Sequence, residues 1–534
     1  MTRLRSVLAV PSLRRVVLAW GLSVVAEAAA LVVLLVVAYD VGGPALVAGF
    51  AVVRAVPALI VAPVVIGWSD RGRRETWLMG VLASRAVLLA LAAGLLVADL
   101  AIASLLVGGV ASLLFSTHRP MNGALLPHVA TTPAQLTAAN AAASFAESAG
   151  TLVGPLLAGL LLVLGPPPVT LAVAAVLVAG SATAVGLIRD VAPSVNVGGA
   201  MTLTSAVNEL ASGMRALDQY RPVIVMVGAQ TFARGVLLVS VVVLAVDLFD
   251  QGDPGVGWLT AMLGVGGLVG SAVAVAAVTS TRITRALATG VALWGLPMVA
   301  IGVLTVPTVG YLGLVVIGIG NAVLDVGMFT LVARVMPPGM LGRAFAALEV
   351  VIVSGVTVGS LVAGAAVPAV GVELALAVTG VMLVVLVARY ASWARRTDAG
   401  LIPDERAVAL RACEALCALP VAAVDHLAAV GTEMVYVDGE DVMVQGEPGS
   451  DFHVVMHGRA VVRRDGHQVA VLGPGSGFGE IALLRHVPRT ATVTAQGPLH
   501  TFVVSRLDFT TFVSGHTAAA AAVANLAQER VPRP

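Results

Sequence analysis

The chain has 534 residues, of which 58% are hydrophobic and only 11% are charged. Its mean hydropathy is +0.97, far from the balance of soluble globular proteins, and this indicates a membrane protein. The net charge of +1 gives no basis for a nucleic-acid partner. Cys413 and Cys417 lie one helical turn apart, and we interpret them as small residues on one helix face, so no metal site is predicted.

Apolar stretches recur along the first three quarters of the chain. Each is roughly 20 residues long, enough to cross a bilayer as a helix. We predict an α-helical polytopic membrane protein with about twelve transmembrane helices in two halves of six. The helices are expected to begin near residues 16, 44, 76, 101, 140, 168, 222, 257, 286, 309, 344 and 371. The predicted halves are residues 1–189 and 222–392, with a polar loop at 190–221 between them.

Arginines mark every second connection between the predicted helices. They follow the second and eighth spans, for example Arg71 and Arg282, and also the last span at Arg395. The alternate connections carry acidic residues such as Asp99 and Asp253 and no arginine. The positive-inside rule therefore predicts a multi-pass protein of a bacterial plasma membrane with both termini in the cytoplasm.

A short basic loop lies between predicted spans two and three. Its sequence, GWSDRGRRE at 67–75, resembles the signature cytoplasmic loop of the major facilitator superfamily, although the spacing from glycine to aspartate is one residue short. By this resemblance Asp70, Arg71, Arg73 and Arg74 would latch the cytoplasmic ends of helices. Short basic loops also occur in other inner-membrane proteins.

A second resemblance lies in predicted span five. The sequence GTLVGPLLAG resembles the glycine-proline motif of antiporters and exporters in that superfamily, and Gly150, Gly154, Pro155 and Gly159 carry it. Close packing of small residues is the alternative reading. The stretches RPMNGALLPHV, LTAAN and MPPGMLGRAF further resemble the branch with macrolide and siderophore exporters. The resemblance implies a superfamily fold and efflux of a small molecule.

Four charged residues are predicted near the middle of spans: Glu27, Arg54, Arg85 and Arg234. A charge inside a membrane costs on the order of 3 kcal/mol, so such groups line a cavity or pair with one another. We expect Glu27 to pair with Arg54, because the two share one half and a similar depth. The carboxylate would then couple proton entry to substrate exit. A static ion pair that fixes helix register is the alternative.

The pattern changes after a linker predicted at 393–406. Residues 407–534 read as helices followed by short alternating strands, which predicts a cytoplasmic β-roll. The stretch FGEIALLRHVPRTATV lies in this region at 478–493. Gly475, Gly477 and Gly479 allow a tight turn before a short helix near Glu480, whose first amide groups form an anion site.

This stretch resembles the phosphate-binding cassette of the cyclic-nucleotide-binding domain family. By resemblance Glu480 would hold the ribose hydroxyl and Arg489 the cyclic phosphate. The backbone from Gly479 through Ile481, Ala482 and Leu483 would bind phosphate oxygens, and Thr490 would lie beside the base. The resemblance implies cAMP or cGMP as regulatory ligand, and the base stays open. A lid helix is expected at 517–529, and His453 stands where an aromatic residue is more usual.

Together these features predict a secondary active transporter, a proton-coupled exporter regulated by cytoplasmic cyclic nucleotide. Its partners would be the bilayer, a small-molecule substrate and the nucleotide. We expect no enzyme, because kinase, cyclase, phosphodiesterase and P-loop motifs are missing from the sequence. A receptor that no longer transports is one alternative, and a transporter whose tail binds no ligand is another. The transported substrate and the oligomeric state stay open.

Overall fold

The computed structural model describes most of the chain. The described residues are 10–69, 74–129, 133–188, 211–215, 217–278, 283–336, 340–400, 405–417, 419, 421–485, 487–514, 523 and 528. The chain divides into two compact units, the first covering Met1–Val332 and Met336–Asp398 and the second including Ala399–Pro534. Each unit is described by itself.

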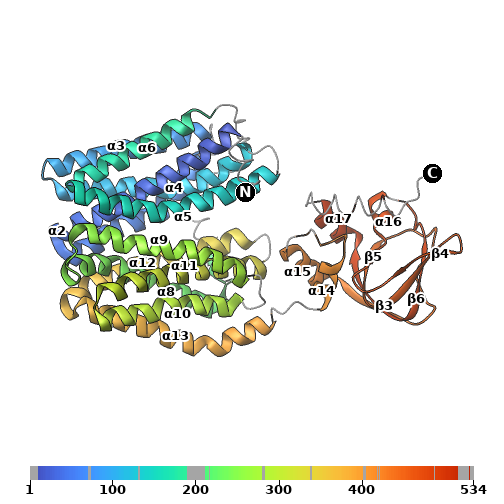
Figure 1. Ribbon diagram of the computed structural model, residues 1–534. Helices are drawn as coiled ribbons and strands as arrows, with labels where there is room; N and C mark the ends of the chain where they lie inside the picture. Colours follow the sequence, from blue (N-terminus) through green and yellow to red (C-terminus); the bar gives the residue numbers. More distant parts are fainter. Residues whose placement is uncertain are drawn as a thin grey trace. The chain divides into compact units, whose positions relative to one another are not determined.

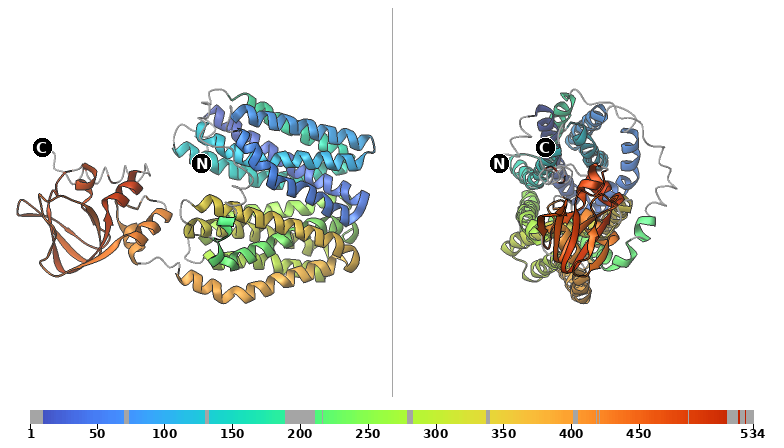
Figure 2. Two further views of the ribbon diagram at one scale, coloured as in Figure 1. Left: turned by 180° about the vertical axis from the view of Figure 1, so that it is seen from behind. Right: turned by 90° about the vertical axis from the view of Figure 1, so that its right-hand side faces the viewer.

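The first unit is helical (Figures 1 and 2). Five described α-helices precede residue 190, and six described α-helices follow residue 220. Two short helical segments, η1 and η2, lie before and after the first of these six. The helices are α2 Pro11–Ser69, α3 Arg74–Val97, α4 Ala101–Val129, α5 Pro133–Leu164, α6 Pro167–Gly186, η1 Asp218–Tyr220, α8 Arg221–Val243, η2 Leu244–Leu248, α9 Gly252–Val278, α10 Ile283–Leu304, α11 Pro307–Val335, α12 Leu341–Val370 and α13 Val372–Gly400.

Within the described residues, eleven helices are long and apolar enough to cross a membrane. The prediction of twelve counts spans one and two separately, whereas α2 runs through both. Gly42 and Gly43 leave helical geometry inside α2, so that two helices join there at a kink. The number twelve and the arrangement in two halves of six therefore stay predictions. The predicted linker at 393–406 overlaps α13, which continues to Gly400.

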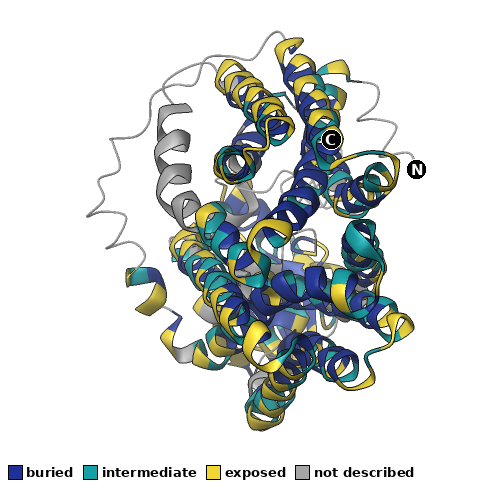
Figure 3. Ribbon diagram, turned by 90° about the vertical axis from the view of Figure 1, so that its left-hand side faces the viewer, coloured by how far each residue is buried: buried dark blue, intermediate teal, exposed yellow. Residues whose placement is uncertain are grey.

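The helices form two adjoining groups (Figures 1 and 2). In the first group α2 packs against α4, α5 and α6, and α3 packs against α4 and α6. In the second, α8 packs against α12. The groups meet where α5 contacts α9 and α2 contacts α12. Figure 3 shows buried residues where helices face one another and exposed residues on the outer faces. Large apolar side chains such as Val87, Val176 and Leu312 are among the exposed residues.

Glycines of α5 allow its closest contacts. A Cβ atom on Gly154 would lie 2.5 Å from the Cβ of Ala28 and 2.7 Å from the carbonyl oxygen of Val25, both on α2. A Cβ on Gly150 would lie 2.7 Å from a methyl group of Val24. Only glycine fits at such distances, because real Cβ atoms do not approach so closely.

The opposite contact of α5 depends on glycines of both helices. A Cβ on Gly257 of α9 would lie 2.6 Å from the backbone nitrogen of Gly159 and 2.6 Å from the carbonyl oxygen of Pro155. The predicted glycine-proline motif of span five thus lies at one of the two contacts between the helix groups. Its close packing is observed, and its role in transport stays a prediction.

The second unit is a β-roll with flanking helices. Its elements are α14 Glu405–Ala412, α15 Val421–Val430, β1 Thr432–Tyr436, β2 Asp441–Met443, β3 Asp451–Arg464, β4 His467–Leu472, β5 Gly477–Phe478, α16 Glu480–Arg485, β6 Thr492–Ser505 and α17 Arg506–Ser514. The strands lie in the order β1-β6-β3-β4, with β2 paired to β6 and β5 paired to β3. Every pair is antiparallel.

Two apolar clusters hold this unit together. One lies between the helices and the sheet and contains Leu410, Leu427, Phe452 and Phe509. The other fills the roll and contains Phe478 and Val493. The predicted lid at 517–529 lies outside the described residues except for two positions, of which Val523 is fully buried in the first cluster.

Candidate functional site

A tight turn leads from β5 into the short helix α16. Gly479 stands at this turn with a φ of +95°, a conformation that favours glycine. A Cβ atom on Gly479 would lie only 2.7 Å from Nη1 of Arg489, so the absence of a side chain lets the arginine approach. The turn therefore places the first residues of α16 beside Arg489.

Backbone carbonyl groups hold the guanidinium of Arg489. Nη1 donates to the carbonyl oxygen of Gly479 at 3.1 Å, and Nη2 donates to that of Asp451 at 2.9 Å. Arg489 is 7% exposed. Its burial lowers the pKa of the guanidinium from its ordinary value, although nearby Asp451 opposes the shift. The charged form is thus less stable here than in water, and an anion bound beside it would restore that stability.

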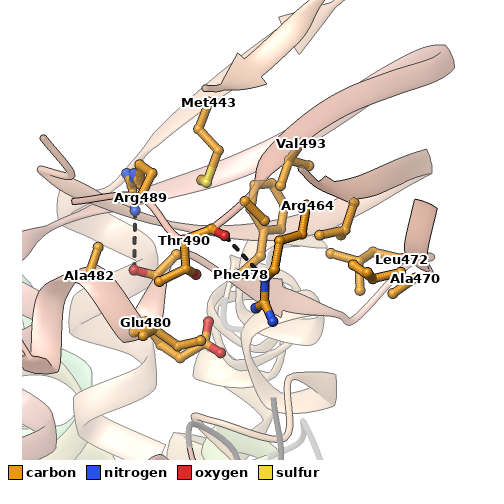
Figure 4. Close-up of a pocket in the computed structure, with 15 residues that line it drawn as sticks. Met443, Arg464, Ala470, Leu472, Phe478, Glu480, Ala482, Arg489, Thr490 and Val493 are labelled. Atoms are coloured by element: carbon orange, nitrogen blue, oxygen red, sulfur yellow. Dashed lines mark hydrogen bonds between the residues drawn. The ribbon is translucent and has the colours of Figure 1, made fainter. Parts of the chain in front are cut away.

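Arg489 and Glu480 line one cavity of about 400 Å³, a volume typical of small-molecule sites (Figure 4). Glu480 is buried, with only 1% of the residue exposed. The remaining lining is mostly apolar and comes largely from β2, β3, β4, β5 and β6. A cationic end, a buried carboxylate and an apolar wall suit a ligand with a phosphate, hydroxyl groups and a flat apolar part.

Six of the seven residues predicted for nucleotide binding line this cavity: Gly479, Glu480, Ile481, Ala482, Arg489 and Thr490. The seventh, Leu483, is fully buried in the apolar cluster between helices and sheet. Its side chain anchors α16 and does not line the cavity. A contact from its backbone to a phosphate stays a prediction.

The structure adds residues that the cassette pattern does not contain. Arg464 at the end of β3 lines the cavity and donates from Nε to the carbonyl oxygen of Thr490 at 3.3 Å. Gly449 lies so close to the arginine that a Cβ there would be 2.8 Å from Cζ of Arg489. The turn sequence Pro448-Gly449 signals a bend, but not the approach of a distant arginine.

His453 contacts Phe478, one of the residues that line the cavity. Its ring stacks on Phe478 with ring centroids 5.1 Å apart and planes at 13°, so it fills the place expected for an aromatic side chain. Burial, assisted by the positive charge of Arg489, lowers the pKa of His453 to about 4. The ring is therefore neutral near pH 7, and its Nδ1 lies 3.4 Å from Oγ1 of Thr501.

A cluster of buried polar side chains lies in the first helix group. Arg85 of α3 is 1% exposed, and its Nη2 lies 2.7 Å from Oε2 of Glu27 on α2. Its Nη1 donates to Oγ of Ser23 at 2.7 Å. Arg54 is a more distant partner, with Nε 3.8 Å from Oε1 of Glu27. The expected partner of Glu27 was Arg54, and the structure makes Arg85 the closer one.

His118 of α4 belongs to the same cluster, although it is not among the residues predicted from the sequence. Its Nδ1 lies 2.9 Å from Oγ of Ser23, so that one hydroxyl group connects the histidine to Arg85. Trp20 and Phe115 enclose it, and the Arg85 guanidinium lies 4.8 Å from the centroid of the Phe115 ring. A histidine within an apolar helix was the available signal.

Three polar atoms of the cluster have no hydrogen-bond partner among the described residues: Oε1 of Glu27, Nε of Arg85 and Nε2 of His118. Buried polar groups are rarely left in this state. Each of them can still form a hydrogen bond to water or to a bound molecule.

The other predicted transport residues lie outside this cluster. Arg234 is exposed on α8 in the second helix group. Of the predicted latch, Asp70, Arg71 and Arg73 lie outside the described residues. Arg74 begins α3, and its side chain is not described. The latch stays a prediction.

Comparison with known proteins identifies the second unit. Residues 433–516 match the family model of the cyclic nucleotide-binding domain. The chain therefore carries a C-terminal cyclic nucleotide-binding domain, which is built around a β-sheet. In the sequence this domain follows a mostly helical region, with eleven candidate membrane helices among the described residues.

One curated relative is a cAMP-dependent protein kinase regulatory subunit from Yarrowia lipolytica. It is 41% identical over 71 residues, which are 13% of this chain and 19% of the relative. The chain thus spans about a fifth of that relative's length.

Two solved structures are similar over the same part of the chain. The regulatory domain of Toxoplasma gondii PKA, crystallised with cAMP, is 25% identical with a TM-score of 0.22, and the match covers 23% of this chain and 49% of that one. The sensor domain of the transcriptional regulator DNR from Pseudomonas aeruginosa is 21% identical with a TM-score of 0.22. That match covers 24% of this chain and 94% of the other.

Proposed function

We propose that the protein is a secondary active transporter, a proton-coupled exporter of small molecules, whose activity is regulated by cAMP or cGMP bound to its C-terminal domain. The observation that carries this proposal is the presence in one chain of an apolar helix bundle and a cyclic nucleotide-binding domain with a formed cavity. The resemblance of five segments of the helical region to the major facilitator superfamily supports the transporter part.

Two observations support a membrane location and proton coupling. Large apolar side chains cover the outer faces of the helices, where lipid would solvate them. The cluster of Glu27, Arg85, Ser23 and His118 offers a carboxylate and an imidazole that can exchange protons inside the bundle. A carboxylate that alternates between an arginine and a proton can link proton entry to substrate exit.

Regulation requires that the nucleotide bind two states of the domain with different affinity. The test is proton flux in proteoliposomes with a macrolide as trial substrate, measured with and without saturating cAMP or cGMP. Coupling free energies are typically 1–3 kcal/mol, so we expect nucleotide to change the flux at least about fivefold. Equal flux with and without nucleotide would remove the regulatory part of the proposal.

A receptor on a transporter fold is the second candidate. It would bind nucleotide in the same way, but substrate would drive no proton flux at any nucleotide concentration. The same flux measurement therefore separates the two candidates.

Topology gives an independent expectation. The arginine distribution places both termini in the cytoplasm and the connection at Asp253 on the other side. Reporter fusions after Asp253 and after Pro534 should report opposite compartments. A common compartment for both fusions would contradict the proposed orientation.

A further inference from the structure

A buried hydroxyl group joins three helices of the first helix group. Nη1 of Arg85 on α3 donates to Oγ of Ser23 on α2 at 2.7 Å, and Nδ1 of His118 on α4 lies 2.9 Å from the same oxygen. Ser23 is fully buried, and Arg85 and His118 are each 1% exposed. The position of Arg85 therefore depends on a group that His118 also contacts.

The direction of these hydrogen bonds follows from the chemistry of the three groups. A guanidinium has donors only, so the oxygen of Ser23 accepts from Arg85. The hydroxyl group keeps one hydrogen to donate, and among the described residues Nδ1 of His118 is the acceptor that contacts it. A lone pair on Nδ1 also suits the nearby positive charge of Arg85 better than a second N–H group would. The imidazole of His118 thus accepts from Ser23 and carries its proton on Nε2.

Arg85 has other partners besides the carboxylate of Glu27. Its Nη2 lies 2.7 Å from Oε2 of Glu27, its Nη1 donates to Ser23, and its guanidinium lies 4.8 Å from the centroid of the Phe115 ring. The face of an aromatic ring attracts a cation. When Glu27 takes up a proton, Arg85 loses its charged partner but keeps Ser23 and Phe115. A buried cation without these partners would be costly.

We propose that His118 is a positioning residue for proton exchange at Glu27. By accepting from the hydroxyl group of Ser23, His118 turns the lone pairs of that oxygen toward Arg85, and a hydroxyl that donates is also a better acceptor. Ser23 then holds Arg85 in place while Glu27 carries the proton. In this role His118 accepts a hydrogen bond and does not carry the transported proton. This inference rests on the proposed function, because it assumes that Glu27 exchanges protons during transport.

Other charged groups surround this part of α2. Among the described residues, Arg85 of α3 and Arg54 of α2 form ion pairs with Glu27. The helix α6 carries no charged residue between Pro167 and Gly186. Further charged groups on helices packed against α2 include Glu75 of α3, Glu147 of α5, Arg234 of α8, Asp253 of α9 and Glu349 of α12. All of them are kept in the variants below, so their titration contributes equally to every pH profile.

The test is the pH dependence of substrate-driven proton flux in proteoliposomes, with a macrolide as trial substrate and a constant pH difference across the membrane. Ser23→Ala should lower the pH of half-maximal flux by about one unit, because a protonated Glu27 then leaves Arg85 with fewer partners. His118→Phe keeps a ring between Trp20 and Phe115 but removes the acceptor, so it should shift the profile in the same direction by about half a unit. His118→Asn offers an amide oxygen in place of Nδ1 and should restore the wild-type profile.

The combined variant Ser23→Ala/His118→Phe shows whether the histidine acts through the hydroxyl group. It should have the profile of Ser23→Ala alone, because His118 reaches Arg85 through Ser23. Thr117 of α4 supplies a matched control. It is fully buried, and its hydroxyl group donates to the carbonyl oxygen of Leu114 at 2.8 Å, outside the cluster. Thr117→Val should therefore leave the profile unchanged.

Several results would overturn the inference and leave proton coupling intact. These are an unshifted profile in Ser23→Ala or in His118→Phe, and shifts that add together in the combined variant. Loss of all flux in both His118→Phe and His118→Asn, with unfolding temperatures like that of the wild type, would make His118 a proton carrier and would also overturn it. A wild type without substrate-driven proton flux would overturn the proposed function and this inference together.

Discussion

Replacement of Arg489 by alanine is expected to lower the affinity of the full-length protein for cyclic nucleotide by roughly a hundredfold, about 2–3 kcal/mol. The guanidinium is nearly buried, is held by the carbonyl groups of Gly479 and Asp451, and lines the cavity beside Glu480. Its removal takes away the charge expected to pair with the cyclic phosphate. Calorimetry with cAMP and cGMP measures the loss.

Arg485 provides the matched control. It is an exposed arginine at the end of α16 that does not line the cavity, so Arg485→Ala should leave the affinity unchanged. Arg489→Lys should fall between, since lysine keeps the charge without the planar fork. An Arg489→Ala protein that binds nucleotide as tightly as the wild type would show that the phosphate lies elsewhere.

The same variant tests regulation. If nucleotide acts on transport through this cavity, Arg489→Ala should retain a basal proton flux that no longer responds to cAMP or cGMP at concentrations saturating for the wild type. A flux that still responds in the variant would place the regulatory site outside the cavity.

Much of the cavity lining could be predicted from the sequence because most of these residues are close together in the chain. Gly479, the α16 residues and Arg489 lie within eleven positions, and the positive φ at Gly479 together with a short helix places them around one space. The cavity residues and contacts that the cassette sequence could not predict come from other parts of the β-roll. Asp451, Gly449 and Arg464 reach Arg489 and Thr490 through the pairing of β3 with β6, and the register of that pairing depends on bulges within the roll.

The sequence could not predict which of the charged side chains in the helical unit lie closest together. Glu27 and Arg54 lie on the same helix α2, on either side of the kink at Gly42 and Gly43. The geometry of that kink decides how near they come, and no side-chain pattern encodes it. Arg85 became the closer partner because the rotation of α3 about its axis is set by packing against α4 and α6. In the same way, the packing of α4 against α2 and α3 places His118 beside Ser23.

The second large effect is expected at Arg85. Arg85→Ala should lower the free energy of unfolding by about 3–5 kcal/mol, because it leaves the carboxylate of Glu27 buried without its closest partner. The two side chains are 1% and 8% exposed and lie 2.7 Å apart. Thermal unfolding of the purified protein in detergent measures the change.

Arg54 supplies the comparison within the same cluster. Its side chain is 33% exposed and lies 3.8 Å from Glu27, so Arg54→Ala should cost less than about 1 kcal/mol. If Arg54→Ala and Arg85→Ala destabilise the protein equally, Arg85 is not the principal partner of Glu27 and the buried pair must be abandoned.

The paired variant Glu27→Gln/Arg85→Gln separates a proton site from a static ion pair. It removes both charges while keeping side chains of similar length, so it should recover much of the stability lost in Arg85→Ala. If Glu27 carries the proton, this folded variant should show no proton flux with the trial substrate, since a glutamine side chain does not exchange a proton near pH 7. Recovery of both stability and proton flux would mean that Glu27 and Arg85 only stabilise the helix bundle. Proton coupling would then depend on another group. The candidate within the described cluster is His118, whose ring is connected to Arg85 through the hydroxyl group of Ser23.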